Sequence, residues 1–322
     1  MNRREFLIGA SAFAPLALRR ERASLTRSRP GQAQARDTAK LSRVAVMSLS
    51  FNGILKNPTQ PDNPARTLDI MDIGEMYADR YGVHNVEMQH AHFISTDESW
   101  LQAFRQRLAK SKSQVTNINL EFGPQNISAA DPALRAQAVD RTKQWIDYAV
   151  VVGCPRIMVN QGAPTQDNKD VATAALKAMG DYGKSKNVMI SMENRGSGAG
   201  RGAGAPGASP AASPTPTPVP PSPAAWVLLV EIIKASGTYA NCDLGNFPDQ
   251  ATQHAGIRGM LPLTDGNVHV KLNPARYDLP AALALTRELG YKGIYSIEAS
   301  SASGGDPHEA VQRIYDVLLA NI

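Results

Sequence analysis

Cysteine is scarce in this sequence, since Cys154 and Cys242 are the only two among 322 residues. Small extracellular domains that depend on disulfides contain many more, so this number excludes a disulfide scaffold. Each cysteine lies in an apolar segment that is typical of a strand. We therefore interpret both as small buried side chains.

The sequence also lacks a long apolar run at its N-terminus. Residues 8–18 are only weakly apolar and include Gly9 and Pro15. Such a segment is too short to cross a bilayer as a stable helix, so we expect no stable transmembrane segment here.

Excess positive charge is confined to the N-terminal part of the chain. The formal net charge is +5, but residues 1–43 hold ten Lys and Arg against three Asp and Glu, which leaves about −2 for the remainder. Binding to a phosphate backbone generally uses a surplus of Lys and Arg. We therefore expect no nucleic-acid partner.

The first residues predict export. Arg3 and Arg4 precede Phe6 and Leu7, and the weakly apolar run follows. This pattern resembles the twin-arginine signal of bacteria, which implies transfer by the twin-arginine export machinery. We predict a periplasmic or otherwise extracytoplasmic protein, with residues 1–40 as export signal and polar linker. An ordinary basic terminus is the alternative.

From Val44 onward, short strand-like runs alternate with amphipathic stretches, which is typical of βαβ units and a parallel sheet. The last stretch shows a helix start, with Asp306 as N-cap and Pro307 after it. Eight units in about 280 residues predict an α/β fold, a single (β/α)8 TIM barrel over residues 41–322. An open doubly wound sheet has the same local pattern. The strand candidates are Val44 to Ser50, Asn85 to Gln89, Val115 to Glu121, Arg156 to Gln161, Val188 to Glu193, Tyr239 to Asp243, Asn267 to Lys271 and Gly293 to Glu298.

One segment interrupts this pattern. Residues 196–225 consist almost entirely of Gly, Ala, Ser, Pro and Thr, and Arg201 is the only charged residue among them. This composition cannot form a core, so it predicts a flexible, disordered insertion after the fifth strand. A tolerated surface insertion is favoured over a functional lid.

Four of the later strands end in a side chain that can bind a metal ion. Because the carboxyl ends of parallel barrel strands meet at one rim, and side chains alternate between the two faces, these four should converge. Three carboxylates and one imidazole in one place would repel and raise one another's pKa unless a cation lay among them. We therefore predict one divalent ion, with Mn²⁺, Mg²⁺, Co²⁺ and Zn²⁺ all compatible with mixed oxygen and nitrogen ligands. The predicted ligands are Glu193, Asp243, His269 and Glu298.

The motifs around these residues resemble those of the xylose isomerase-like TIM barrel family. They are Met192-Glu193-Asn194, Cys242-Asp243-Leu244-Gly245-Asn246, Val268-His269-Val270-Lys271 and Ile297-Glu298. The family includes sugar phosphate isomerases and epimerases, ketose 3-epimerases, inosose dehydratases and endonuclease IV. The resemblance implies that the same four residues bind the metal. It also implies that Glu193 and Glu298 are catalytic and transfer protons next to a carbonyl of a carbohydrate substrate.

The surrounding residues depart from the family pattern. Many members have a His shortly after each of the first two ligands, where this chain has Arg195 and Asn246. Many also follow the His-x-Lys pair with Asp, where this chain has Leu272. A typical epimerase specificity therefore does not follow from the resemblance.

Several further residues are candidates for contact with the substrate. Lys271 shares the inward face with His269, and a structural salt bridge is its alternative role. A His-x-His pair can chelate a metal, but such a pair in a loop is more often unliganded. Glu121 and Asn160 are weaker candidates. The substrate-binding predictions are Lys271, Glu87, Gln89, Asn246, Arg195 and His92, the last of which pairs with His90.

The leading functional hypothesis is a metal-dependent isomerase or epimerase acting on a sugar or sugar derivative. A metal-dependent lyase or dehydratase acting on a keto-sugar or keto-inositol would use the same groups. A non-catalytic carbohydrate-binding protein is a third hypothesis. DNA repair, as in the endonuclease IV branch, is disfavoured by the near-neutral body of the chain and the predicted export.

Overall fold

The computed structural model describes residues 38–56, 62–195, 225–300 and 305–322. Within them, eight parallel strands follow the order β6-β5-β4-β3-β2-β1-β8-β7. Strand β1 pairs with both β2 and β8, so the sheet is rolled into a barrel and is not an open doubly wound sheet. The predicted (β/α)8 fold is confirmed. The strands are β1 (Val44–Met47), β2 (Asn85–Gln89), β3 (Gln114–Asn119), β4 (Arg156–Met158), β5 (Met189–Glu193), β6 (Tyr239–Asn241), β7 (Asn267–Val270) and β8 (Ile294–Ile297).

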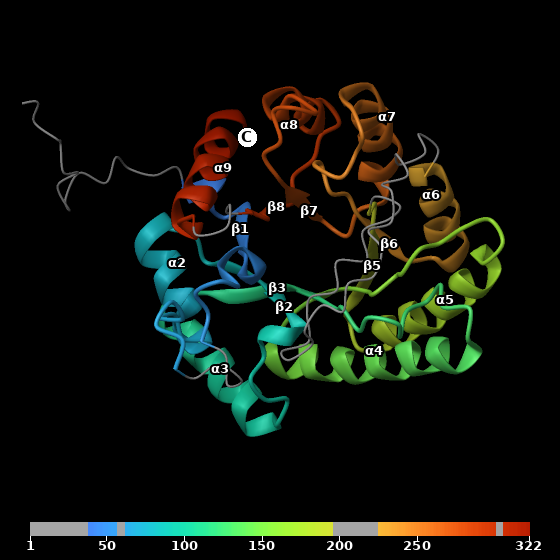
Figure 1. Ribbon diagram of the computed structural model, residues 1–322, viewed down its shortest axis with the longest axis horizontal. Coiled ribbons are helices and arrows are strands. Elements are labelled where there is room, and N and C mark those ends of the chain that lie inside the picture. Colours follow the sequence, from blue (N-terminus) through green and yellow to red (C-terminus); the bar gives the residue numbers. More distant parts are fainter. Residues whose placement is uncertain (1–37, 57–61, 196–224, 301–304) are drawn as a thin grey trace, which may run out of the picture. The chain divides into compact units, whose positions relative to one another are not determined.

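Helices surround the strands on the outside (Figure 1). Three of them begin with an aspartate N-cap and a proline in the first turn, as Asp306 and Pro307 predicted for the last helix. Each cap side chain accepts a hydrogen bond from a backbone N–H of the first turn. The main helices are α2 (Ile73–Tyr81), α3 (Glu98–Lys110), α4 (Pro132–Val152), α5 (Lys169–Ser185), α6 (Ala225–Ser236), α7 (Gln250–Met260), α8 (Leu279–Glu288) and α9 (Pro307–Asn321).

The barrel is nearly closed, and its seam lies between β6 and β7. Within the described residues these two strands share no ladder. The Asp265 N–H donates to the Ala240 carbonyl at 3.3 Å near one end of the seam. At the other end, the Leu244 N–H donates to the His269 carbonyl at 3.0 Å. Loop backbone therefore bridges the seam where strand pairing stops.

The two faces of the strands differ in polarity. One face carries apolar side chains, such as Val46, Met88 and Ile190, that pack beneath the helices. The other face points into the barrel and is mostly polar, whereas TIM barrels usually fill this space with branched apolar residues. Because buried polar groups need hydrogen-bond partners, this interior should form a connected network. Its polar members, each at most 5% exposed, are Asn85, Glu87, Gln89, Asn117, Asn119, Ser191, Glu193, Asn241, Asn267, His269 and Ser296.

Several strands end earlier than the sequence pattern predicts. Strand β1 ends at Met47 because Ser48–Phe51 form a 3-10 helix. Strand β4 ends at Met158 and not at Gln161, and β6 ends before Asp243. The apolar runs continue into the rim loops, where single backbone hydrogen bonds, such as that from the Val159 N–H to the Ser191 carbonyl, extend the pairing and side-chain hydrogen bonds add to it.

The described residues bear on some of the other predictions. Thr38–Leu41, partly assigned to the linker, form the short helix α1, and Lys40 donates to the Leu319 carbonyl at 2.8 Å. The rest of the predicted export signal lies outside the described residues. So does the predicted insertion, apart from Ala225, with which α6 begins.

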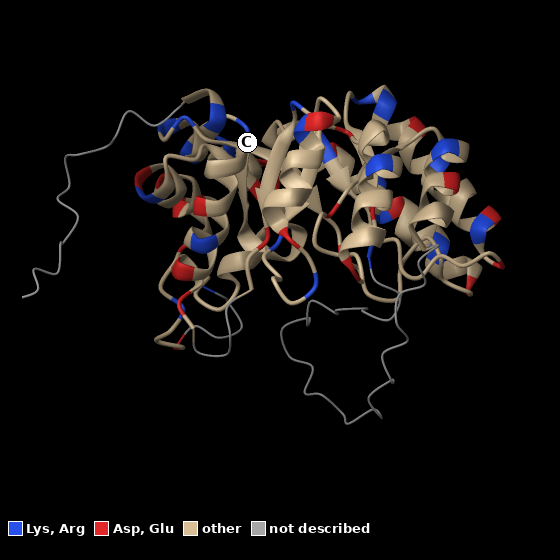
Figure 2. Ribbon diagram, turned by 90° about the horizontal axis from the view of Figure 1, so that it is seen from above, with Lys and Arg blue, Asp and Glu red and all other residues tan. Residues whose placement is uncertain are grey.

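Both cysteines are free and buried, as predicted. Among the described residues, no helix combines the length and the apolarity needed to cross a membrane. Positions of Lys and Arg alternate with positions of Asp and Glu along the outer helices in the view of Figure 2.

Candidate metal centre

The four predicted ligands meet at the carboxyl ends of β5 to β8. One ligand atom from each of them lies within 4.8 Å of the others. Asp243 and His269 are fully buried, and Glu298 is the most open, with 13% of its side chain exposed. The structure thus brings together the set that strand position and parity predicted, which is Glu193, Asp243, His269 and Glu298.

The ring of His269 turns one nitrogen toward the three carboxylates. Its Nδ1 lies 3.2 Å from Glu193 Oε1, 3.4 Å from Glu298 Oε2 and 3.9 Å from Asp243 Oδ2. The buried Asp243 Oδ2 has no hydrogen bond of good geometry within the described residues, although the Lys271 ammonium lies 2.6 Å away. Three carboxylates and one imidazole nitrogen that converge on one buried point form a donor set that fits a divalent cation.

Electrostatics support this fit. The pKa of Asp243 is raised to about 7, mainly by burial and also by the charges of Glu193 and Glu298, although Lys271 and His269 lower it. Burial also disfavours the charged form of Glu193, but Arg195 and His269 outweigh it and hold its pKa well below the usual range. Ionisation of Asp243 therefore stays unfavourable when the Lys and His side chains of the chain are its only cationic partners. A bound metal ion would favour the ionised form.

Two side-chain amides fix the backbone of the first two ligands. Gln161 donates to the Glu193 carbonyl at 2.5 Å and accepts from the Glu193 N–H at 2.7 Å. Asn194 donates to the Asp243 carbonyl at 2.9 Å and accepts from the Asp243 N–H at 2.7 Å. Each amide thus continues a backbone ladder beyond the end of its strand. We call Gln161 and Asn194 the amide clamps.

Backbone contacts also fix Glu298. Its N–H donates to the Val270 carbonyl at 3.0 Å. On either side of it, the Ser50 hydroxyl donates to the Ile297 carbonyl and accepts from the Ala299 N–H. The position of this ligand is therefore set by two neighbouring strand ends, β1 and β7.

Two of the residues that depart from the family pattern, Arg195 and Asn246, contact the candidate ligands, and so does Lys271. Arg195 Nε donates to Glu193 Oε2 at 2.6 Å, and the same guanidinium pairs with Glu121. Asn246 donates to Glu193 Oε1 at 3.0 Å. Lys271 Nζ lies 2.6 Å from Asp243 Oδ2, as described above, and donates to Asn246 Oδ1 at 3.0 Å. Arg195, Asn246 and Lys271 therefore lie at the site, and their contact with substrate stays a prediction.

Glu87, which was predicted to contact the substrate, lies inside the barrel and not at its rim. Glu87 is fully buried, and its carboxylate accepts hydrogen bonds from Asn119 and Asn267. It has the parity of Gln89, but two residues along a strand correspond to about 6–7 Å of depth, so it lies below the rim. Parity predicted the inward direction and gave no information about depth. Gln89 is the strand end, is 3% exposed, and stays a candidate.

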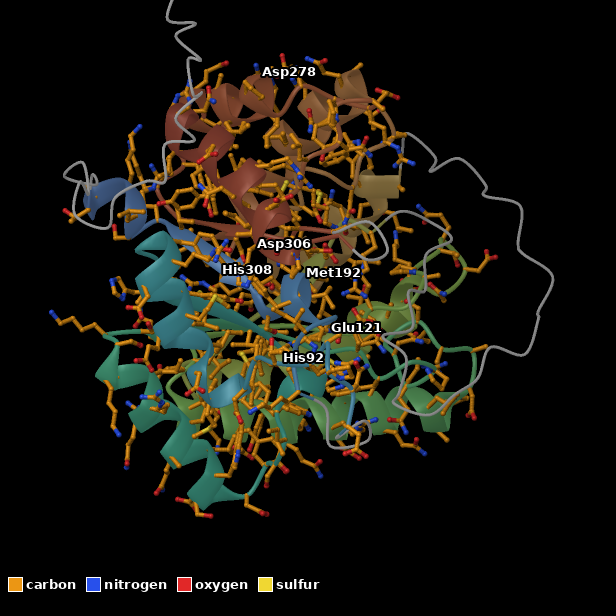
Figure 3. All side chains as sticks on the ribbon, turned by 60° about the vertical axis from the view of Figure 1, so that its left-hand side comes forward. His92, Glu121, Met192, Asp278, Asp306 and His308 are labelled. Carbon is orange, nitrogen blue, oxygen red and sulfur yellow. The ribbon has the colours of Figure 1, made fainter. Side chains whose placement is uncertain are left out.

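The two histidines after β2 do not form a chelating pair. His90 Nδ1 accepts from the Glu121 N–H at 3.1 Å, and burial lowers the pKa of His90 to about 4. His92 instead contacts the hydroxyl of Ser48 and the amide oxygen of Asn52 through its two nitrogens. His92 and Glu121 lie in the same central region in Figure 3. A role for His92 in substrate binding stays a prediction.

Several functional positions were missed by the sequence reasoning. The amide clamps, and the asparagines Asn117 and Asn119, received no role. The available signal was the presence of amides at alternate inward positions of otherwise apolar strands. Amides in such places have to find buried partners.

The comparison with protein families gives one match. Residues 77–206 match the model described as "Xylose isomerase-like TIM barrel". This stretch runs from α2 past β5 and includes one of the four candidate ligands, Glu193. No curated protein matches the chain.

Solved structures of sugar epimerases have the same fold. L-ribulose 3-epimerase is 16% identical with a TM-score of 0.61, and the likeness covers 87% of this chain and 95% of that one. D-allulose 3-epimerase from Methylomonas sp., in complex with D-allulose, is 13% identical with a TM-score of 0.58, covering 87% and 98%. The 3-keto-D-glucoside 4-epimerase from E. coli is 12% identical with a TM-score of 0.59, covering 87% and 99%. These likenesses confirm the barrel, and with the family-model match they support the resemblance to the xylose isomerase-like family.

The cluster predicts stabilisation by a divalent ion. Mn²⁺ added to chelator-treated protein at 100 times its dissociation constant should stabilise the fold by about 2.7 kcal/mol, because the ion binds only the folded state. Thermal unfolding with and without Mn²⁺ measures this effect. Asp243→Asn should lose most of the shift, whereas Asp265→Asn, a buried carboxylate outside the cluster, should keep it. Equal shifts in wild type and Asp243→Asn would contradict the site.

The amide clamp at Asp243 predicts a linked loss of stability and metal affinity. Asn194→Leu leaves a buried N–H and C=O unpaired, which should cost roughly 1–3 kcal/mol of unfolding free energy. It should also weaken Mn²⁺ binding because the Asp243 backbone is no longer held. Asn168→Ala is the matched control, since its amide bonds backbone away from the cluster. Urea denaturation and Mn²⁺ titration measure the two effects, and unchanged affinity in Asn194→Leu would argue against the clamp.

Proposed function

We propose that this chain is a metal-dependent isomerase or epimerase that acts on a sugar or sugar derivative. The observation that carries the proposal is the convergence of Glu193, Asp243, His269 and Glu298 within 4.8 Å at the barrel rim. Active sites of TIM barrels lie at this rim. The solved structures with the same fold include epimerases of ketoses and of a keto-glucoside.

The residues of the chain divide the work in this proposal. The four ligands would hold one divalent ion, which when bound polarises substrate oxygens next to the carbon that loses its proton. Glu298 is the more open of the two proposed catalytic carboxylates, with 13% of its side chain exposed against 5% for Glu193. It is therefore the better placed to take and return a proton. Lys271, 3.1 Å from Glu298 Oε1, would orient that carboxylate and a substrate oxygen.

A lyase reaction is a second candidate, and one observation favours it. Both oxygens of Glu193 are engaged, Oε2 by Arg195 at 2.6 Å and Oε1 by Asn246 at 3.0 Å. Epimerisation with two carboxylates on opposite faces of the substrate would need Glu193 to exchange a proton. Elimination from a keto-sugar can proceed with one carboxylate that takes the proton, which here is Glu298.

The role of Glu298 predicts loss of turnover in Glu298→Gln. The variant should keep the fold, whereas solvent-deuterium exchange into L-ribulose, D-allulose or a 3-keto-glucoside should fall at least about 100-fold, because general acid-base catalysis contributes about 10²–10⁴. Proton NMR in D₂O follows the exchange, and parallel metal analysis verifies that the ion is still bound. Wild-type exchange rates in the variant would exclude this role. Sugar binding by both proteins, without exchange in either, would favour a non-catalytic binding protein.

The two reactions predict different products from a 3-keto-glucoside that carries a nitrophenyl aglycone. Epimerisation moves a proton and keeps the glycosidic bond, so the aglycone stays attached. Elimination breaks the bond and releases nitrophenol, which absorbs visible light. Incubation with Mn²⁺-loaded wild type, with Glu298→Gln as control, should give exchange without colour if the leading proposal holds. Colour released in step with exchange would replace that proposal by the lyase.

A further inference from the structure

A buried carboxylate lies beneath the metal centre, inside the barrel. Glu87 is fully buried, and its Oε1 accepts from the amide groups of Asn119 at 2.6 Å and Asn117 at 3.1 Å. Its Oε2 accepts from the amide of Asn267 at 3.0 Å. The fourth contact is His269, whose Nε2 lies 2.6 Å from Oε1. Of these four partners, three are neutral amides, and His269 is the one that can carry charge.

A bulge in the sheet makes this arrangement possible. The β2–β3 register shifts after Val86, which pairs with Val115, so that Glu87 pairs with Asn117. Thr116 is the extra residue, and it reverses the side-chain parity of the rest of β3. Val115 therefore packs beneath the helices, while Asn117 and the residue two positions later, Asn119, point inward to Glu87.

The contact with Glu87 determines which nitrogen of His269 carries the proton. An ionised carboxylate only accepts hydrogen bonds, so His269 Nε2 carries the hydrogen that Glu87 receives. In the neutral ring, the lone pair is then on Nδ1, which is the nitrogen that faces Glu193, Glu298 and Asp243.

The amide of Asn241 lies against the same ring nitrogen, at 2.9 Å from Nε2. Its oxygen is buried without a partner. Its Nδ2 also donates to Met158 Sδ at 3.2 Å. Because the two ends of an amide are nearly the same in shape, the opposite orientation would place the oxygen against an Nε2 hydrogen and give up this weak contact. Asn241 is therefore compatible with the hydrogen on Nε2 but does not select the tautomer, which the contact with Glu87 does.

We infer that Glu87 is a positioning residue for the metal centre. It fixes His269 with the hydrogen on Nε2 and holds the ring so that Nδ1 points to the ion, while Asn117, Asn119 and Asn267 fix Glu87 itself. Carboxylates that accept from a metal-binding histidine increase its basicity and orient its ring. Glu87 contacts neither the ion nor the substrate. The inference rests on the proposed metal site.

The test is a double-mutant cycle on Mn²⁺ affinity in chelator-treated protein. Glu87→Gln keeps the shape of the side chain, and the unpartnered oxygen of Asn267 can pair with the new amide after rotation. The variant should bind Mn²⁺ about 10- to 100-fold more weakly than wild type. In a His269→Gln background, where no imidazole remains to be oriented, the same change should alter affinity by less than about twofold. Asp265→Asn is the control for loss of a buried carboxylate and should bind like wild type.

The outcomes separate the inference from the proposed function. Wild type that binds no Mn²⁺ would remove the metal site and the proposed function with it. Wild type that binds, with Glu87→Gln within about twofold of it, would overturn the role of Glu87 alone. An equal loss in both backgrounds would also overturn it, because a general structural effect does not need His269. If Glu87→Gln does not fold, Asn119→Ala replaces it in the cycle. We then expect a several-fold loss of Mn²⁺ affinity in protein that retains His269, and no loss in the His269→Gln background.

Discussion

The crowding of carboxylates in and around the mouth of the barrel is the constraint on which the rest of this site depends. In the low dielectric of a protein interior, nearby like charges repel strongly, and each of them needs a partner. Glu87 accepts hydrogen bonds from amides and contacts His269, whereas Arg195 forms ion pairs with both Glu121 and Glu193. Lys271 serves Asp243 and Glu298. The pKa of Asp243 nevertheless stays raised, at about 7, so the cations of the chain do not fully compensate the cluster. A bound divalent ion would supply the missing charge.

The same constraint explains the residues that depart from the family pattern. Arg195 and Asn246 take both oxygens of Glu193, which leaves this carboxylate less free to exchange protons than Glu298. The change of residues around the candidate ligands is thus a change in how these residues are held. His269 contacts both Glu87 and Glu193, so the polar interior of the barrel and the cluster at its rim form one network.

Much of this organisation could be predicted from the sequence, and the remainder has identifiable physical reasons. The ligands followed from strand position and parity, because an apolar run that ends in Glu193 or Glu298 carries that information locally. The depth of Glu87 in the barrel could not be predicted in this way, because side-chain parity repeats every two residues and does not distinguish one level of the barrel from the next. The bulge at Thr116 could not be predicted either, because it depends on the register between β3 and β2. The amide clamps also depend on distant partners, 32 residues apart for Gln161 and Glu193.

The position of the ligands relative to the seam explains why the site needs clamps at all. Asp243 follows β6 and His269 belongs to β7, the two strands that share no ladder within the described residues. Strand pairing alone would leave the distance between these two ligands loosely set. Asn194 ties Asp243 to the end of β5, and the Leu244 N–H ties the same loop to the His269 carbonyl. An ion bound by Asp243 and His269 would span the seam as well, and would add to the backbone contacts that already bridge it.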